Sequence, residues 1–144
     1  VSILFLLISV CPFTLANLSA VHDKISEHAV PKDIPTVLLI SVDPNRDKIA
    51  DLRNYVRHFN PTFRAATGTK EMIDQFVKGI GGFYEFGPKK DDNTYRVDHS
   101  AEAFVVDPLG HVVESLNPPL VPHVTAARFQ KMISLFQKTN APHL

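Results

Sequence analysis

The chain of 144 residues is 44% hydrophobic, and its 15 basic and 15 acidic residues give a formal net charge of zero. This length and composition suit one hydrophobic core, so we expect a single domain over residues 1–144. The balanced charge argues against a basic surface, so we expect no nucleic acid as a partner. The one cysteine, Cys11, has no second thiol with which to form an internal disulfide bond.

Residues 1–10 form an almost entirely apolar run. The run is too short to cross a bilayer, no basic segment precedes it, and Val10 stands where a cleavage site requires a small residue. We therefore expect a buried strand rather than a targeting segment. Because the chain begins at Val1 without a methionine and enters this run at once, we also expect that an N-terminal part is missing. No membrane anchor is expected within the sequence itself.

A helix is predicted directly after this strand, over residues 13–29. Pro12 suits its first turn, because the N–H that proline lacks would be unpaired there. Cys11 then lies at the helix N-terminus, where the helix dipole and free N–H groups favour a thiolate. The alternative is that Cys11 is a small buried hydrophobic residue. The residues at helical spacing on the inner face are Leu15, Leu18, Val21, His22 and Ile25.

Strands and helices alternate in the next part of the chain, at residues 36–42 (strand), 48–59 (helix), 63–66 (strand) and 70–78 (helix). The first strand is an almost unbroken aliphatic run, which is typical of a strand covered on both faces. The turn at residues 43–47 is expected to cap the first helix, and Thr69 is expected to cap the second. Their expected inward-facing residues are Ile49, Leu52, Val56, Phe59, Met72, Ile73, Phe76 and Val77.

The last third of the chain predicts strands at residues 83–86, 103–106 and 111–115 and a helix at 124–138, with a charged, solvated loop at 87–94. Alternating strands and helices imply a parallel sheet with crossover helices on its faces. The terminal hairpin adds antiparallel strands. The predicted fold class is therefore α/β, with a thioredoxin-like sheet and flanking helices and with its N-terminal part missing.

His99 lies in a polar segment, residues 95–100, just before the strand at 103–106. It is either bonded to the loop backbone or placed for chemistry. Cys11 follows the first parallel strand and His99 precedes an antiparallel one, so both belong to the edge where open α/β sheets carry their sites, and we expect them to converge. Asp98 either orients His99 or caps the loop. The remaining histidines lack ligand spacing and are interpreted as surface or loop residues: His22, His28, His58, His111 and His123.

Five segments in this order resemble the SCO/SenC family: residues 11–18, 41–47, 67–69, 95–100 and 107–110. The resemblance covers nearly the whole chain. It implies a thioredoxin-like domain, usually tethered to a membrane by an N-terminal helix, that handles copper during assembly of cytochrome c oxidase. The family's copper site is two cysteines in Cys-x-x-x-Cys and the histidine of an Asp-His-Ser/Thr loop. By position, Cys11 matches the second cysteine and His99 the histidine, while Leu7 stands at the place of the first cysteine.

On this resemblance we expect a copper-binding assembly factor with Cys11 and His99 as the metal ligands. Its partner would be a cytochrome c oxidase subunit or another copper chaperone. Leu7 has no lone pair, so the site is incomplete and should bind Cu(I) more weakly than two thiolates and an imidazole would. We expect no enzymatic activity, since one thiol cannot cycle between a dithiol and an internal disulfide. The resemblance also implies membrane association at the extracytoplasmic face of the inner membrane, in the bacterial periplasm or, alternatively, in mitochondria.

Two alternatives remain open. A thioredoxin-like domain without metal chemistry, acting as an interaction module, would keep the fold and bind no metal. A single-cysteine thiol peroxidase would use Cys11 as its nucleophile. Peroxiredoxins carry a threonine three residues before the reactive cysteine, and here that position is Ile8, which argues against the peroxidase.

Overall fold

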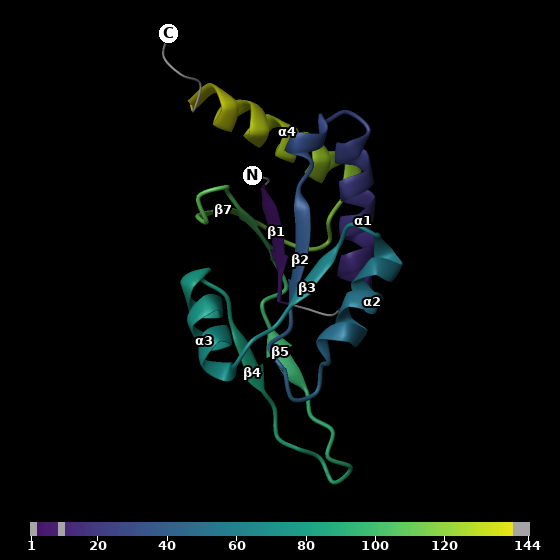
Figure 1. The fold of residues 1–144 in the computed structure, drawn as a ribbon, viewed down its shortest axis with the longest axis vertical. Helices are drawn as coiled ribbons and strands as arrows, with labels where there is room; N and C mark the ends of the chain where they lie inside the picture. The colour runs from purple at the N-terminus through teal and green to yellow at the C-terminus, as the bar shows by residue number, and fades with distance from the viewer. Residues whose placement is uncertain (1–2, 9–10, 140–144) are drawn as a thin grey trace.

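The computed structural model describes residues 3–8 and 11–139 (Figure 1). Its first half contains β1 (Leu4–Leu7), α1 (Pro12–Ser26), a short 3₁₀ helix η1 (Pro31–Asp33), β2 (Thr36–Ile40), α2 (Ile49–Phe59) and β3 (Arg64–Ala66). Its second half contains α3 (Lys70–Gly79), β4 (Tyr84–Phe86), β5 (Val97–His99), β6 (Ala103–Val106), β7 (Val112–Leu116) and α4 (Pro122–Thr139). Strands and helices alternate as the sequence predicts.

Five strands form one mixed sheet in the order β3-β2-β1-β6-β7. β1 and β2 are parallel, as are β2 and β3, whereas β6 runs antiparallel to both β1 and β7. Residues of α1, α2 and α4 pack on one face of this sheet, and residues of α3 pack on the other (Figure 1). The predicted α/β sheet with flanking helices is confirmed.

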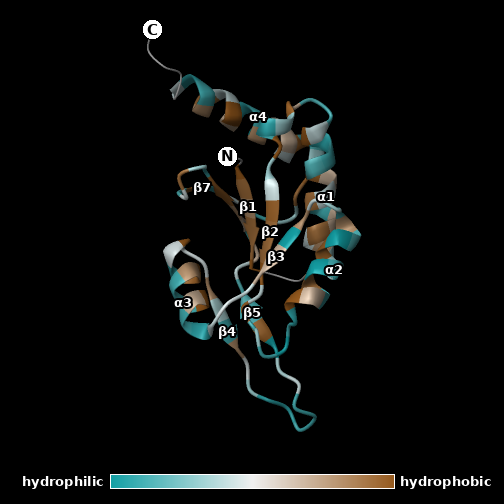
Figure 2. Ribbon diagram, in the orientation of Figure 1, coloured by the Kyte–Doolittle hydropathy of each residue, from teal (hydrophilic) through white to brown (hydrophobic). Residues whose placement is uncertain are grey.

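The buried strand β1 lies at the centre of this sheet and is hydrophobic along its length (Figure 2). Its apolar side chains pack on both faces of the sheet. Phe5 and Leu7 face α1 and α4, while Leu6 and Ile8 face α3. The ring of Phe5 meets Phe129 of α4 edge to face, with centroids 5.2 Å apart. The strand predicted from the apolar run is therefore confirmed over Leu4–Leu7. The rest of that run at residues 1–2 and 9–10 lies outside the described residues.

Helices α2 and α3 bury narrower stripes than the sequence predicts. Leu52, Val56, Ile73 and Val77 are buried, as expected, but the Met72 side chain is 61% exposed, and Ile49 and Phe76 are also exposed. Met72 and Phe76 each lie about 100° around the axis of α3 from the buried residue that follows them, so they remain in contact with solvent. Ile49 is the first residue of α2.

The two predicted caps differ in outcome. Thr69 caps α3, since its hydroxyl oxygen accepts a hydrogen bond from the Met72 backbone N–H at 3.3 Å. The turn at residues 43–47 does not cap α2, because Lys48 occupies the N-cap position. The carboxylate of Asp47 instead accepts a hydrogen bond from the Ser41 hydroxyl at 2.7 Å, which ties the turn back to the end of β2.

The segment around His99 is a strand rather than the predicted loop. Val97–His99 forms β5, which pairs antiparallel with β4, and His99 lies opposite Tyr84. These two strands form a small sheet of their own. A strand of three residues is too short, and Asp98 and His99 are too polar, for hydrophobic alternation to predict it.

His22 is buried, which contradicts its interpretation as a surface residue. Its side chain lies on the inner face of α1 and is only 6% exposed. The side-chain amide of Asn60 donates to Nδ1 of His22 at 3.4 Å, and the imidazole ring meets Phe63 edge to face. Burial lowers the pKa of His22, because the charged imidazolium would lose its hydration.

We expect this histidine to make the protein less stable in mild acid. As the pH falls below about 6.5, the unfolded chain takes up a proton at His22, while the folded chain does so only at a lower pH, so unfolding becomes easier. Urea denaturation at pH 7.5 and pH 5.5 should therefore differ less for His22→Gln than for the wild type. His58→Gln, at an exposed histidine, should retain the wild-type difference. An unchanged difference in His22→Gln would assign the pH dependence to another group.

Candidate metal centre

Cys11 lies four residues beyond the last residue of β1, at the N-cap of α1, with Pro12 in the first turn. Hydrogen bonding from the backbone N–H of Thr14 lowers the pKa of the Cys11 thiol and outweighs the opposing effect of burial. The side chain is exposed. The predicted helix N-terminal position is confirmed, and the alternative of a buried hydrophobic cysteine is wrong. This sulfur therefore has increased thiolate character and is accessible to a metal ion.

The charge on Cys11 also affects Tyr55 of α2. The pKa of Tyr55 is raised, first by burial and in addition by the negative charge of the Cys11 thiolate. Tyr55 lines a groove of about 440 Å³ together with Arg46 and Asp47.

His99 is half-buried at the end of β5. Its Nδ1 lies 2.9 Å from the carbonyl oxygen of Ser100. A carbonyl can only accept, so Nδ1 carries the proton and Nε2 keeps a lone pair for a metal ion. Of the two alternatives for Asp98, orientation of His99 is wrong: its carboxylate lies 2.5 Å from Nε of Arg96, and the Ser100 carbonyl fixes the tautomer.

The turn between β2 and α2 lies beside His99. His99 lines a cavity of about 30 Å³ together with Asp43, Arg46 and Asp47. The same cavity is lined by Ile8, which directly follows β1, and by Ile40, the last residue of β2, and Cys11 follows Ile8 by three residues. Cys11 and His99 therefore both belong to the carboxyl end of the parallel strands, as predicted, and the convergence of their side chains stays a prediction.

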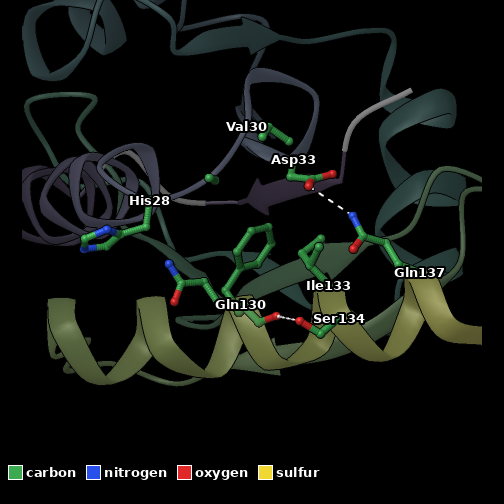
Figure 3. Close-up of a pocket in the computed structure, with 9 residues that line it drawn as sticks. His28, Val30, Asp33, Gln130, Ile133, Ser134 and Gln137 are labelled. Atoms are coloured by element: carbon green, nitrogen blue, oxygen red, sulfur yellow. Dashed lines mark hydrogen bonds between the residues drawn. The ribbon is translucent and has the colours of Figure 1, made fainter.

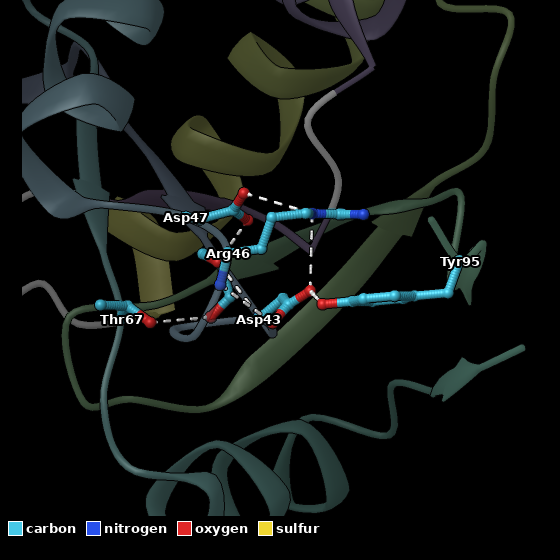
Figure 4. A network of polar contacts seen from close by, with 6 residues as sticks. Asp43, Arg46, Asp47, Thr67 and Tyr95 are labelled. Carbon is cyan, nitrogen blue, oxygen red and sulfur yellow. Dashed lines mark hydrogen bonds and ion pairs between the residues drawn. The ribbon is translucent and has the colours of Figure 1, made fainter. Parts of the chain in front are cut away.

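A polar network organises this turn (Figure 4). The hydroxyl of Tyr95 donates to Oδ2 of Asp43, and Nε of Arg46 lies 3.5 Å from the same oxygen. Arg46 also stacks over the Tyr95 ring at 5.1 Å. The sequence interpretation of Asp43 as a turn residue missed this contact, because nothing in a local pattern pairs residues 52 positions apart.

Leu7 supplies no donor to the site. It lies within β1, opposite Leu39, and its side chain is fully buried in the core. Among the residues that the structure describes, no group of three or more histidine, cysteine, aspartate or glutamate side chains is arranged to hold a metal ion. The available donor set is one thiolate and one imidazole. Both are ligands that Cu(I) accepts, so the residues fit this soft ion with two donors.

A further cavity, of about 350 Å³, lies between the α1–η1 connection and α4 (Figure 3). Gln137 and Asp33 form a hydrogen bond across it, at 3.0 Å. Its lining comes from the opposite end of the molecule to β5, so it is not part of the candidate site (Figure 1).

No helix in residues 3–8 and 11–139 has the length and apolar character needed to span a membrane.

Comparisons with known proteins identify relatives along most of the chain. The human "Protein SCO1 homolog, mitochondrial" is 36% identical over 105 residues, which are 73% of this chain and 35% of that protein. The bovine "Protein SCO2 homolog, mitochondrial" is 36% identical over 102 residues, which are 70% of this chain and 38% of that protein. The chain thus spans little more than a third of the length of these relatives.

Two solved structures of similar fold are described with copper bound. Arabidopsis thaliana ScoI matches with a TM-score of 0.78 and 27% identity, over 93% of this chain and 84% of that chain. Bradyrhizobium japonicum ScoI matches with a TM-score of 0.73 and 26% identity, over 90% of this chain and 83% of that chain. These matches confirm the predicted thioredoxin-like sheet. The SCO1/SenC family model matches residues 8–134, and the chain belongs to this family.

Proposed function

We propose that this protein is a copper-binding assembly factor for cytochrome c oxidase, with Cys11 and His99 as its copper ligands. The observation that carries the proposal is an exposed thiol at the N-cap position of α1 and an imidazole whose Nδ1 is bonded to a carbonyl, both beside the carboxyl end of the parallel strands. The copper-bound ScoI structures and the family membership support it. Copper is the cargo of this function.

The donor set suits transfer of copper between proteins. The Cys11 thiolate supplies the soft ligand that selects Cu(I), and the proton on Nδ1 of His99 keeps its Nε2 free to bind. Two donors leave coordination positions that a partner's thiolate or imidazole can fill. Copper can then pass by ligand exchange, with no change in its oxidation state. We propose no enzymatic turnover, because Cys11 alone cannot form an internal disulfide.

We further propose that the partner is a cytochrome c oxidase subunit or another copper chaperone. We also propose that the protein works at the extracytoplasmic face of the inner membrane, in a bacterial periplasm or its mitochondrial equivalent. The names of the human and bovine relatives, both mitochondrial SCO proteins, support such a location. Fractionation of cells that express the protein, with an accessibility assay on the intact membrane, tests this placement.

The test of the proposed function is Cu(I) retention against a graded series of Cu(I) chelators. We expect the wild type to retain Cu(I) and His99→Ala to bind it at least about tenfold more weakly, because one of two donors is lost. His28→Ala, at a histidine that is 72% exposed and distant from the site, should bind like the wild type. If the wild type retains no Cu(I), the copper function is wrong, and the fold serves as an interaction module without metal chemistry.

A further inference from the structure

The strand that carries His99 is not part of the main sheet. Within the described residues, β4 and β5 pair only with each other, and we call them with their connecting loop the His99 hairpin (residues 84–99). The hairpin is closed by the Gly87 N–H donating to the Arg96 carbonyl and the Ser100 N–H donating to the Phe83 carbonyl, both at 2.8 Å. An isolated two-stranded hairpin is marginally stable in water. Its order, and the position of His99, therefore depend on its contacts with the body of the protein.

One of these contacts joins the hairpin to the edge of the sheet that adjoins Cys11. Tyr95 projects from the hairpin, and its hydroxyl donates to Oδ2 of Asp43, which follows β2 (Figure 4). The Asp43 side chain is 5% exposed, so the charge-assisted bond is shielded from water. Hydrogen bonding to Asp43 also raises the pKa of Tyr95, which keeps the hydroxyl protonated as a donor. Arg46 covers the ring of Tyr95 from the same turn.

Asp43 is held firmly by its own turn. Its backbone N–H donates to the Ser41 hydroxyl at 3.2 Å, and that hydroxyl donates to Asp47 at 2.7 Å. The Arg46 backbone N–H donates to the other carboxylate oxygen of Asp43 at 3.3 Å. The Thr67 hydroxyl donates to the Ser41 carbonyl at 3.2 Å, which joins the turn to the end of β3. Tyr95 is therefore bonded to a side chain whose position is held by the hydrogen bonds of its turn.

The hairpin makes a second bond of the same chemical kind in a different environment. The hydroxyl of Tyr84 donates to Asp74 of α3. The Asp74 side chain is 46% exposed and also pairs with Lys70 at 2.7 Å. Each carboxylate would keep a cationic partner, Lys70 for Asp74 and Arg46 for Asp43, but only the exposed Asp74 could replace the lost hydroxyl by water. The two bonds should therefore differ in strength.

We propose that Tyr95 and Asp43 are positioning residues, which clamp the His99 hairpin to the β2–α2 turn and so hold His99 at the edge of the sheet that Cys11 adjoins. The copper part of this inference rests on the proposed function. The attachment of the hairpin by Tyr95 and Asp43 does not depend on the proposed function. Neither residue contacts the metal in this scheme; both act through the position of His99.

The first test uses the metal-free protein. Hydrogen–deuterium exchange at the amides of Gly87 and Ser100 reports opening of the hairpin. Tyr95→Phe keeps the ring and removes the hydroxyl. We expect this substitution to raise the exchange rates of both amides at least about tenfold. The matched variant Tyr84→Phe should change these exchange rates less than about threefold, because the bond from Tyr84 to Asp74 is exposed to water. Equal exchange in Tyr95→Phe and the wild type would overturn the clamp.

The second test measures Cu(I) retention in the same variants. Tyr95→Phe should bind Cu(I) about tenfold more weakly than Tyr84→Phe under conditions where urea denaturation shows both variants to be fully folded, so that a smaller folded fraction does not account for the difference. Faster exchange with unchanged Cu(I) affinity would overturn the positioning role. If the wild type itself retains no Cu(I), the proposed function fails, and the exchange rates of Gly87 and Ser100 alone decide whether the clamp stands.

Discussion

Cys11→Ser is expected to weaken Cu(I) retention by more than about 100-fold. Loss of a residue that merely orients a metal ligand costs roughly 10- to 100-fold in affinity, and Cys11 is proposed to bind the metal directly. A serine hydroxyl is a hard, neutral donor that Cu(I) disfavours, so it does not replace the thiolate. His99 would remain as the one donor of the pair. The effect should therefore exceed that of His99→Ala, which leaves the soft ligand in place.

The structure makes this substitution a clean test. Cys11 is the N-cap of α1, and serine is among the preferred N-cap residues, so the helix should be as stable as before or more stable by up to about 1 kcal/mol. Competition with a Cu(I) chelator measures the affinity, and urea denaturation of the metal-free protein confirms that the fold is intact. Equal Cu(I) affinity in Cys11→Ser and the wild type would remove Cys11 from the site and contradict the proposed function.

The sequence predicts that Cys11 and His99 belong to one edge of the sheet, but it does not predict the surroundings of either residue. Cys11 and His99 could be related because each flanks a strand whose direction follows from the alternation of strands and helices, and strand ends meet at one edge of a sheet. The tautomer of His99 depends on the Ser100 carbonyl, a backbone atom that any residue would supply. The sequence left Asp98 open between this role and capping of the loop, and its carboxylate is instead occupied by Arg96.

The contact between Tyr95 and Asp43 illustrates a different limit. The two residues stand 52 positions apart, and their bond exists because the hairpin folds back on the β2–α2 turn. Both occur in segments that carry the family resemblance, residues 41–47 and 95–100, so the residues were visible in the sequence while their partnership was not. The burial of His22 could have been predicted, because helical spacing placed it on the inner face of α1, but it was interpreted as a surface or loop residue because the histidines lack ligand spacing.

Leu7 shows how the structure changes the meaning of a sequence difference. From the sequence, Leu7 is an absent thiolate at the position of the family's first cysteine. In the structure it is a core residue of β1, fully buried and opposite Leu39 in the register of β1 and β2. The side chain stabilises the fold by burial of apolar surface, roughly 1.5–3 kcal/mol for a leucine. Position 7 therefore contributes to the core while Cys11 and His99 remain the available donors.

Phe5→Ala is expected to destabilise the protein by about 3–5 kcal/mol, the usual cost of removing a fully buried phenylalanine. Its ring lies at the centre of the sheet and meets Phe129 edge to face, so the substitution leaves a cavity between β1 and α4. Phe13→Ala is the matched control: this side chain is 64% exposed, and its loss should change stability by no more than about 0.5 kcal/mol. Urea denaturation measures both changes in the free energy of unfolding, provided that this free energy depends on urea concentration with the same slope in each variant. A cost below about 1 kcal/mol for Phe5→Ala would contradict the central position of β1.

The same variant separates the role of β1 from that of the metal ligands. Cys11 follows β1 by four residues, so the strand determines where the thiolate lies, whereas Phe5 itself packs in the core against Phe129 of α4. Phe5→Ala should therefore lose Cu(I) only in proportion to the fraction that is unfolded. At a temperature where the variant is still folded, its affinity for Cu(I) should match that of the wild type. A lower affinity in the folded variant would mean that packing beneath β1 controls the site directly, in addition to its effect on stability.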